Sequence, residues 1–270
     1  MIGPLDMLAL LAVLLIGVPH GAADAAIAMQ TRLADSRQKL IAFLVIYCAI
    51  TALVVAAWFI APSVSLLIFL ALTVFHFGRG DALVYGRAAV SLRALLHGGF
   101  IISVALIHEV EVSALFRLLT VQDAWPIMTA LRLAFLFWLV ALGLALIGNK
   151  ISLSAFAEIA ALFVLACAVP PLVAFALYFC GVHSLRHFKR LARDPRLNTA
   201  AHRRLALALA AVSILAIAGA AYSISPQQIG DGLMQSLFIA LAALTVPHML
   251  LVDGLDPLYR TNTERNHASA

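Results

Sequence analysis

The chain has 270 residues, of which 64% are hydrophobic and 11% are charged, and its formal net charge is +5. Globular domains are nearer half apolar and a quarter charged, so this composition excludes an ordinary soluble enzyme and indicates a polytopic membrane protein. The positive excess then mostly reports membrane topology, and nucleic acid is not an expected partner.

Nine apolar segments follow one another along the chain and are expected to form one integral membrane domain over residues 1–270. Runs of this length are typical of membrane helices, so we expect an all-α bundle of about nine transmembrane helices. Val64–Gly78 is short for a span of about 20 residues and is expected to be tilted or incomplete. The segments are Leu5–Met29, Leu40–Ala61, Val64–Gly78, Ala94–Leu115, Met128–Gly148, Ile151–Val169, Leu172–His187, Leu205–Tyr222 and Leu233–Leu251.

The start of the first segment and two stretches between segments lead to three further predictions. The first segment has no basic region in front of it and contains Asp6, so we expect a retained helix rather than a cleaved signal peptide. Phe116–Ile127 is expected to lie at the membrane interface. Pro170 and Pro171 predict a tight turn between two helices, because proline interrupts a continuous helix.

The basic residues predict the orientation. With the N-terminus outside and the C-terminus cytoplasmic, all but two of the 18 Lys and Arg residues lie on the inner side, as the positive-inside rule requires. The two exceptions are Arg117 and Arg132. The inner set is Arg32, Arg37, Lys39, Arg79, Arg87, Arg93, Lys150, Arg186, Lys189, Arg190, Arg193, Arg196, Arg203, Arg204, Arg260 and Arg265.

Five histidines share one depth in this topology, toward the inner ends of the odd-numbered segments. His183 and His187 are four residues apart, so on a helix they share one face and can bind one metal ion. Polar groups inside a membrane are costly and usually mark function. The sequence therefore predicts a metal site near the cytoplasmic leaflet, formed by His20, His76, His183, His187 and His248.

Carboxylates follow three of these histidines, in PHGAAD, FHFGRGD and PHMLLVD. A histidine ligand usually donates its second ring N–H to a carboxylate or carbonyl, so Asp24, Asp81 and Asp253 are expected to orient the ligands. Asp24, four residues after His20, is expected on the same face if the helix continues, whereas Asp81 and Asp253 follow at five and reach their histidines only if the helix ends or bends. Small residues next to the histidines, namely Gly21, Gly78 and Gly181, are expected to let helices approach closely.

The remaining histidines are expected to lie outside this site. His97 begins the fourth segment near the inner side and is the one further candidate for the layer. His108 lies beside two glutamates near the outer side and is expected to be solvated. His202, in a basic loop, and His267, in the tail, are expected at the surface.

Neutral imidazoles suit zinc, copper, iron or nickel, and the residues alone do not choose among these metals. Two other functions use the same histidines. An ion or proton transporter would use them as a relay, although the outer halves of the odd helices carry almost no ionisable residues. A bis-histidine haem protein would use them as axial ligands. A di-iron desaturase would need a second HxxxH box besides His183–His187.

The ordered set PHGAAD, FHFG, CGVHSLRH and PHMLLVD resembles the Brp/Blh family of membrane β-carotene 15,15'-dioxygenases, and the likeness spans most of the chain. Ala94–Val169 carries no matching motif. The resemblance implies cleavage of the central double bond of β-carotene by O2 to two all-trans-retinal molecules at a non-haem Fe(II) centre, with retinal passed on to a rhodopsin. No catalytic residue is expected beyond the metal site.

The family's essential histidines match four residues by motif, and these are the expected iron ligands: His20, His76, His183 and His187. His248 is a second-tier ligand or a pocket residue. Aromatic side chains that flank the ligands are expected to line the polyene pocket, namely Phe75, Phe77, Tyr178 and Phe179. An apolar pocket suits a substrate delivered from the bilayer.

Overall fold

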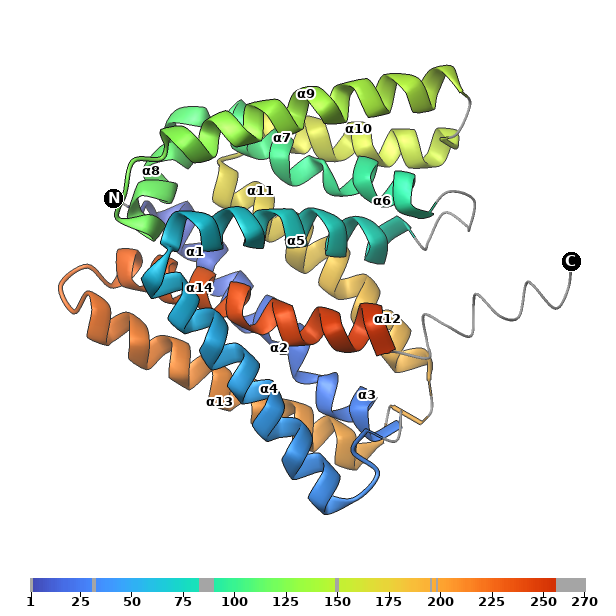
Figure 1. The fold of residues 1–270 in the computed structure, drawn as a ribbon, viewed down its shortest axis with the longest axis vertical. Coiled ribbons are helices and arrows are strands. Elements are labelled where there is room, and N and C mark those ends of the chain that lie inside the picture. The colour runs from blue at the N-terminus through green and yellow to red at the C-terminus, as the bar shows by residue number, and fades with distance from the viewer. Residues whose placement is uncertain are drawn as a thin grey trace, which may run out of the picture.

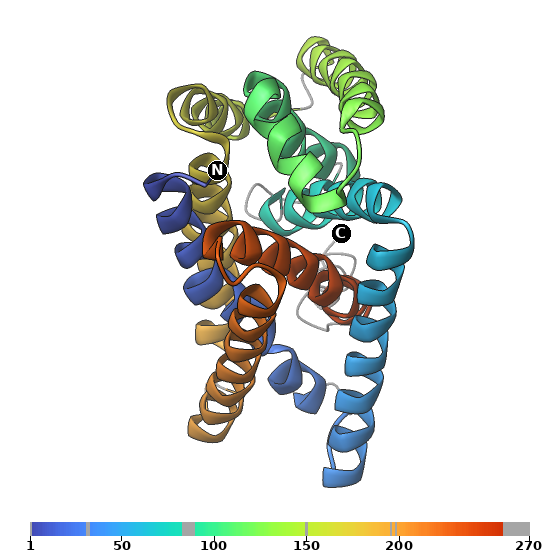
Figure 2. The same ribbon diagram turned by 90° about the vertical axis from the view of Figure 1, so that its left-hand side faces the viewer.

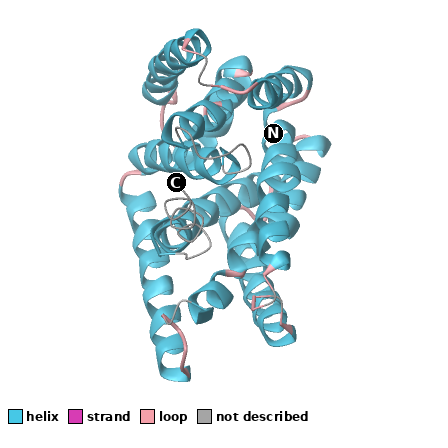
Figure 3. Ribbon diagram, turned by 90° about the vertical axis from the view of Figure 1, so that its right-hand side faces the viewer, coloured by secondary structure: helices cyan, strands magenta, loops and turns pink. Residues whose placement is uncertain are grey.

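The structure, a computed structural model, describes residues 2–30, 33–82, 90–148, 151–194, 196–197 and 199–255. Within these ranges the regular elements are all helices, as Figure 3 shows. The elements are α1 Pro4–Ala12, η1 Val13–Gly17, α2 Val18–Ala22, α3 Asp24–Gln30, α4 Arg37–Ile60, α5 Pro62–Ala82, α6 Val90–Gly98, α7 Phe100–Ile107, α8 Glu109–Thr120, α9 Trp125–Ile147, α10 Leu153–Ala168, α11 Pro171–Tyr178, η3 Phe179–Ser184, α12 Leu185–Arg193, α13 Ala200–Ile224, α14 Ile229–Met249 and η4 Leu250–Leu255, where η marks a π-helical segment. The expected all-α class is confirmed.

Six described helical runs are long and apolar enough to cross a membrane. A seventh is added when the bent pair Ala94–Ile107 and Glu109–Thr120 counts as one span. The six are Pro4–Gln30, Arg37–Ile60, Pro62–Asp81, Trp125–Ile147, Ala200–Ile224 and Ile229–Gly254. The protein is therefore a multi-pass membrane protein by length and composition. The predicted segment Ile151–Val169 forms a shorter helix, α10, of 16 residues.

Two of the predicted segments differ from the helices that form. α5 has 21 residues and is long enough to span, so of the two alternatives expected for Val64–Gly78 the incomplete helix is wrong, and the tilt stays a prediction. The helix continues past the apolar run because its polar end, with His76 and Asp81, is buried against other helices. The segment Ala94–Leu115 is bent by 97° rather than straight.

The bend in that segment lies at His108, whose φ of −114° and ψ of 48° are not helical. His108 Nε2 donates a hydrogen bond of 2.7 Å to the Ala166 carbonyl oxygen on α10. His108 is therefore partly buried and bonded, and the expectation that it is solvated is wrong. His202, expected at the surface, is also buried, although the residues around it on the first turn of α13 are exposed. His267 lies outside the described residues.

The turn predicted at Pro170 and Pro171 is confirmed. α10 ends at Ala168, and α11 begins with Pro171 at its first position, where the missing N–H of proline breaks no helical hydrogen bond. The interfacial expectation for Phe116–Ile127 remains a prediction. In the structure α8 continues to Thr120, and α9 starts at the exposed Trp125.

α14 lies at the centre of the bundle, as Figures 1 and 2 show. α4 and α13 pack on it from either side, and the group of α7, α9 and α10 lies on the opposite side of α5. The helices that contact α14 most are α1, α2, α4, α5, α8 and α13. Because His248 lies in the last turn of α14, this central helix brings that side chain among the other elements.

α5 and α6 approach closely at two glycines. A Cβ atom on Gly78 would overlap the carbonyl oxygen of Ala94, and one on Gly98 would overlap the carbonyl oxygen of Val74. Close approach at Gly78 was expected. The same expectation is wrong for Gly21 and Gly181, where an added Cβ would meet no described atom within 4 Å.

Gly98→Ala is expected to destabilise the protein by about 1–3 kcal/mol, because the added methyl forces α5 and α6 apart. The measurement is the melting temperature in detergent. Gly143→Ala on α9 is the matched control, since open space surrounds that glycine and alanine favours helix. Equal melting temperatures for the two variants would contradict the tight packing of α5 on α6.

Candidate metal centre

Five histidines from five elements lie together inside the bundle. His20 comes from α2, His76 from α5, His183 from η3, His187 from α12 and His248 from the end of α14. None of the five side chains is more than 5% exposed. The structure thus brings together every histidine that the sequence placed in the buried layer.

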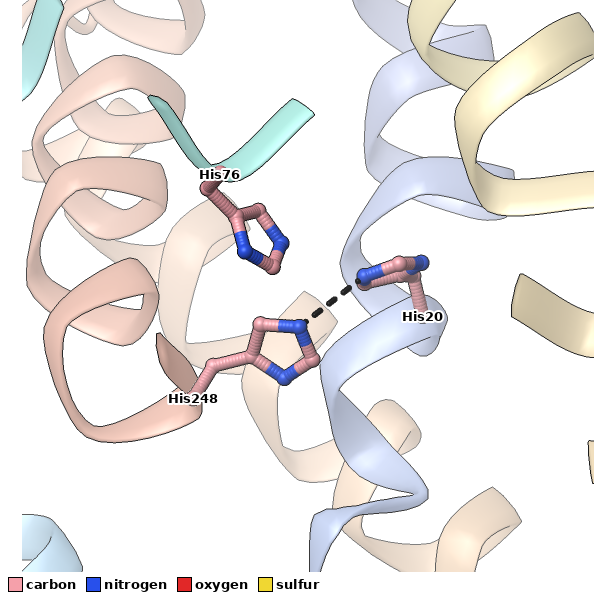
Figure 4. A group of neighbouring side chains, drawn as sticks. All are labelled: His20, His76 and His248. Carbon is pink, nitrogen blue, oxygen red and sulfur yellow. Dashed lines mark hydrogen bonds between the residues drawn. The ribbon is translucent and has the colours of Figure 1, made fainter. Parts of the chain in front are cut away.

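Three of these histidines form the tightest group. One ring nitrogen each from His20, His76 and His248 all lie within 4.8 Å of one another. Figure 4 shows the three rings facing a common point, with His20 Nε2 at 3.2 Å from His248 Nε2. Two nitrogens each about 2.1 Å from one metal ion would be separated by roughly this distance, so the spacing suits a shared cation.

The rings of His183 and His187 lie next to the group formed by His20, His76 and His248. The ring centroids of His20 and His187 are 4.2 Å apart, and those of His20 and His183 are 5.0 Å apart. The His183 ring also lies 5.1 Å from His76. His187 therefore contacts His20 most closely, and His183 lies between His20 and His76.

Carboxylates orient the rings, but each pairs with a histidine of another helix. His248 Nδ1 lies 2.8 Å from Asp24 Oδ1, and His76 Nδ1 lies 2.9 Å from Asp253 Oδ2. The expectation that Asp24 serves His20 on its own helix face is wrong, because Asp24 faces α14. Asp24 and Asp253 therefore do pair with cluster histidines, as predicted, but each pairs with a histidine of another helix and not with the one that precedes it in sequence.

Asp81 follows the same rule. Its Oδ2 lies 3.6 Å from His183 Nδ1 and accepts a 2.7 Å hydrogen bond from the Tyr178 hydroxyl. Arg186 Nη1 lies 3.4 Å from Asp81 Oδ1 and so balances the charge of this fully buried carboxylate. Burying an unpaired carboxylate would be costly, and these neighbours offset that cost.

The pairings leave ring nitrogens facing inward. When Nδ1 of His76 or His248 donates to its carboxylate, Nε2 of the same ring carries a lone pair. Among the described residues, Nε2 of His76, His183 and His187 has no hydrogen-bond partner. Buried polar atoms are rarely left without a partner, so these three ring nitrogens fit a bound metal.

Three π-helical segments adjoin the histidine group. η1 ends three residues before His20, η3 contains His183, and η4 follows α14 and carries Asp253. A π turn adds a residue to a helical turn and redirects the side chains after it. In η4 this places Asp253 beside His76 of α5.

His97 lies outside the group of imidazoles. Its Nε2 is 3.3 Å from Glu158 Oε1 on α10 and 4.0 Å from Asp81 Oδ2. Glu158 in turn accepts a 2.6 Å hydrogen bond from Arg186. His97 therefore belongs to the charged network behind His183.

Tyr47 is a site residue that sequence reasoning missed. Its hydroxyl donates a 2.9 Å hydrogen bond to Asp24 Oδ2, the carboxylate that orients His248. The available signal was a hydroxyl-bearing side chain in the middle of the apolar segment Leu40–Ala61. Glu158 was missed in the same way, as the acidic residue inside Ile151–Val169.

A cavity of about 650 Å³ adjoins the centre, and His20, His76 and His248 are part of its wall. The rest of the wall is mostly apolar. Of the expected pocket aromatics, Phe77 and Phe179 line the cavity. Tyr178 instead bonds to Asp81, and Phe75 is 48% exposed. Aromatic rings that the sequence did not single out also line it, namely Phe43, Phe69 and Phe175.

Comparison with known proteins adds two matches. A family described as Beta-carotene 15,15'-dioxygenase matches residues 11–256. The Beta-carotene 15,15'-dioxygenase of an uncultured marine bacterium, 66A03, is 34% identical over 257 residues, which cover 92% of this chain and 93% of that protein. No solved structure matches the chain.

Asp24→Asn is expected to lower the affinity for a divalent metal by about 10–100-fold, because the amide holds the His248 ring less firmly in the ligating orientation. Tyr47→Phe should act in the same direction with a smaller effect. Metal affinity is measured by competition with a chelator of known strength. Tyr222→Phe is the control, since Tyr222 is 67% exposed on α13. Unchanged affinity in Asp24→Asn would contradict the role given to this pair.

Proposed function

Because the chain belongs to the beta-carotene 15,15'-dioxygenase family and is an enzyme, we propose that it cleaves the central 15,15' double bond of β-carotene with O2 to give two molecules of all-trans-retinal. The observation that carries this proposal is the group of buried imidazoles in the wall of an apolar cavity. Such a site unites ligands for a redox metal with space for a hydrocarbon.

The proposed cofactor is non-haem Fe(II), held by His20, His76, His183 and His187. The 3.2 Å separation of His20 and His248 supports His248 as a further ligand. Iron would supply the redox chemistry that O2 activation needs and that zinc lacks. The donor set fits, since neutral imidazoles with inward lone pairs are ligands that iron accepts.

The protein's own groups have positioning roles in this proposal. Asp24 and Asp253 hold the imidazoles of His248 and His76 in one tautomer, and Tyr47 holds Asp24. Asp81 lies 3.6 Å from His183 Nδ1 and acts on that ring by its charge. Phe77 and Phe179 stack with parallel rings 5.3 Å apart and offer a flat apolar wall to a polyene. The overall reaction breaks one C=C bond and forms two C=O bonds with no net proton, so no general base is required.

We further propose nine passes through the cell membrane, the inner membrane in a two-membrane cell. The N-terminus would be outside, the C-terminus cytoplasmic, and the histidines in the cytoplasmic half. The biased distribution of Lys and Arg supports this orientation. In Figure 1 the start of α1 and the end of α14 also lie at opposite ends of the bundle. Retinal made there would leave within the bilayer, where a rhodopsin could take it up.

Purified protein with bound iron is expected to convert β-carotene and O2 to two equivalents of retinal, measured by chromatography. His183→Ala should lose activity by at least about 100-fold, because the site loses a ligand. His202→Ala is the control, since His202 makes none of the ring contacts of the cluster. Wild-type cleavage rates in His183→Ala would contradict the site, and iron-loaded protein without retinal would contradict the substrate.

Removal of the metal by a chelator is expected to lower the melting temperature in detergent, because binding to the folded state alone stabilises it by mass action. Unligated imidazoles would also remain buried without partners. Re-addition of Fe(II) should restore the transition. An unchanged melting curve after metal loss, verified by mass spectrometry, would contradict a metal shared among helices.

A further inference from the structure

The cavity is open toward the outside of the bundle along α4. Three residues of its wall, Cys48, Ala52 and Ala56, are also exposed. They are spaced by four residues and so form one stripe on the helix. Val212 of α13 faces the same opening, lining the cavity while 64% exposed. The cavity thus has small side chains at its mouth and histidines deeper inside.

The two helices beside the opening, α4 and α13, pack against the same two elements. α4 and α13 each pack on α14 and on α3. They lie on either side of α14 in Figure 2. The most apolar part of α4 contains no buried residue, so this helix contributes little to the core. The wall of the opening on the α4 side is therefore only lightly packed.

The depth of the opening decides what can reach it. Cys48 lies at the middle of α4 (Arg37–Ile60), and Val212 lies at the middle of α13 (Ala200–Ile224). The middle of a spanning helix lies in the hydrocarbon layer, far from both headgroup regions. A water-soluble molecule cannot approach a mouth at that depth, whereas a dissolved hydrocarbon can.

We infer that the opening between α4 and α13 is the lateral route by which the polyene hydrocarbon passes from the bilayer to the histidine centre. The inference rests on the proposed function and adds the path and its residues. Ala52 and Ala56 leave room for the bulky end of the polyene. Tyr47 and Thr51, which directly precede Cys48 and Ala52, also line the cavity. A lipid acyl chain is the competing occupant.

The test narrows the opening from each side. Ala52→Trp and Val212→Trp place a large ring in the mouth. Ala49→Trp and Leu215→Trp are the matched controls, because both residues are exposed on the same two helices and neither lines the cavity. The probe is β-carotene under anaerobic conditions, where no cleavage occurs. The readout is the carotenoid retained per protein after purification, with retinal formation in air measured separately.

Ala52→Trp and Val212→Trp are expected to reduce bound β-carotene by at least about tenfold, with the controls within about twofold of the unaltered protein. Iron content and melting temperature should stay unchanged, which separates a blocked route from a misfolded chain. If only one of the two blocking variants folds, its comparison with its own control decides.

Equal β-carotene binding in the blocking variants and their controls would overturn the inference. It would also be overturned if the blocking variants lost only bound phospholipid, detected by mass spectrometry. A protein that binds β-carotene, loses it in Ala52→Trp and still makes no retinal would support the lateral route and contradict the proposed cleavage. The two proposals can therefore fail separately.

Discussion

The structure depends on satisfying five imidazoles and three carboxylates inside a membrane bundle. These groups are satisfied by hydrogen bonds between helices, in which Asp24 pairs with His248 and Asp253 pairs with His76. Each carboxylate thus bonds to a histidine of another helix, and this arrangement is called the exchange below. Each pairing joins elements far apart in the chain, so polar groups that would be costly alone act as links between helices. The site and the fold are held together by the same contacts.

This exchange also explains where the helices depart from regularity. π-helical segments precede, contain or follow His20, His183 and His248, respectively. Residues five apart, such as His248 and Asp253, point about 140° apart on a straight α-helix, because each residue turns the helix by about 100°. The wider turns of η4 bring Asp253 nearer to the side of the helix that carries His248. Irregular backbone inside a bilayer is tolerated where it is buried in protein, and the histidines beside these segments, His20, His183 and His248, are all buried.

The meeting of the five histidines could be predicted from the sequence, because apolar run length and the positions of Lys and Arg gave all five the same expected depth. The prediction that the histidines share one layer followed from depth alone. Lateral arrangement could not be predicted in the same way. Nothing local to PHGAAD says that Asp24 faces α14 rather than His20, and nothing local to Tyr47 says that it reaches Asp24. The bend at His108 likewise arises from tertiary contact with α10, which overrides the apolar run.

The place of α14 has a consequence for how the molecule is made. His248 and Asp253 are translated after the other four histidines of the cluster, and α14 packs against both the first helices and the walls of the cavity. A ribosome-bound chain that has inserted its earlier helices still lacks two members of the polar exchange. The group of five histidines is therefore completed only when α14 enters the bundle.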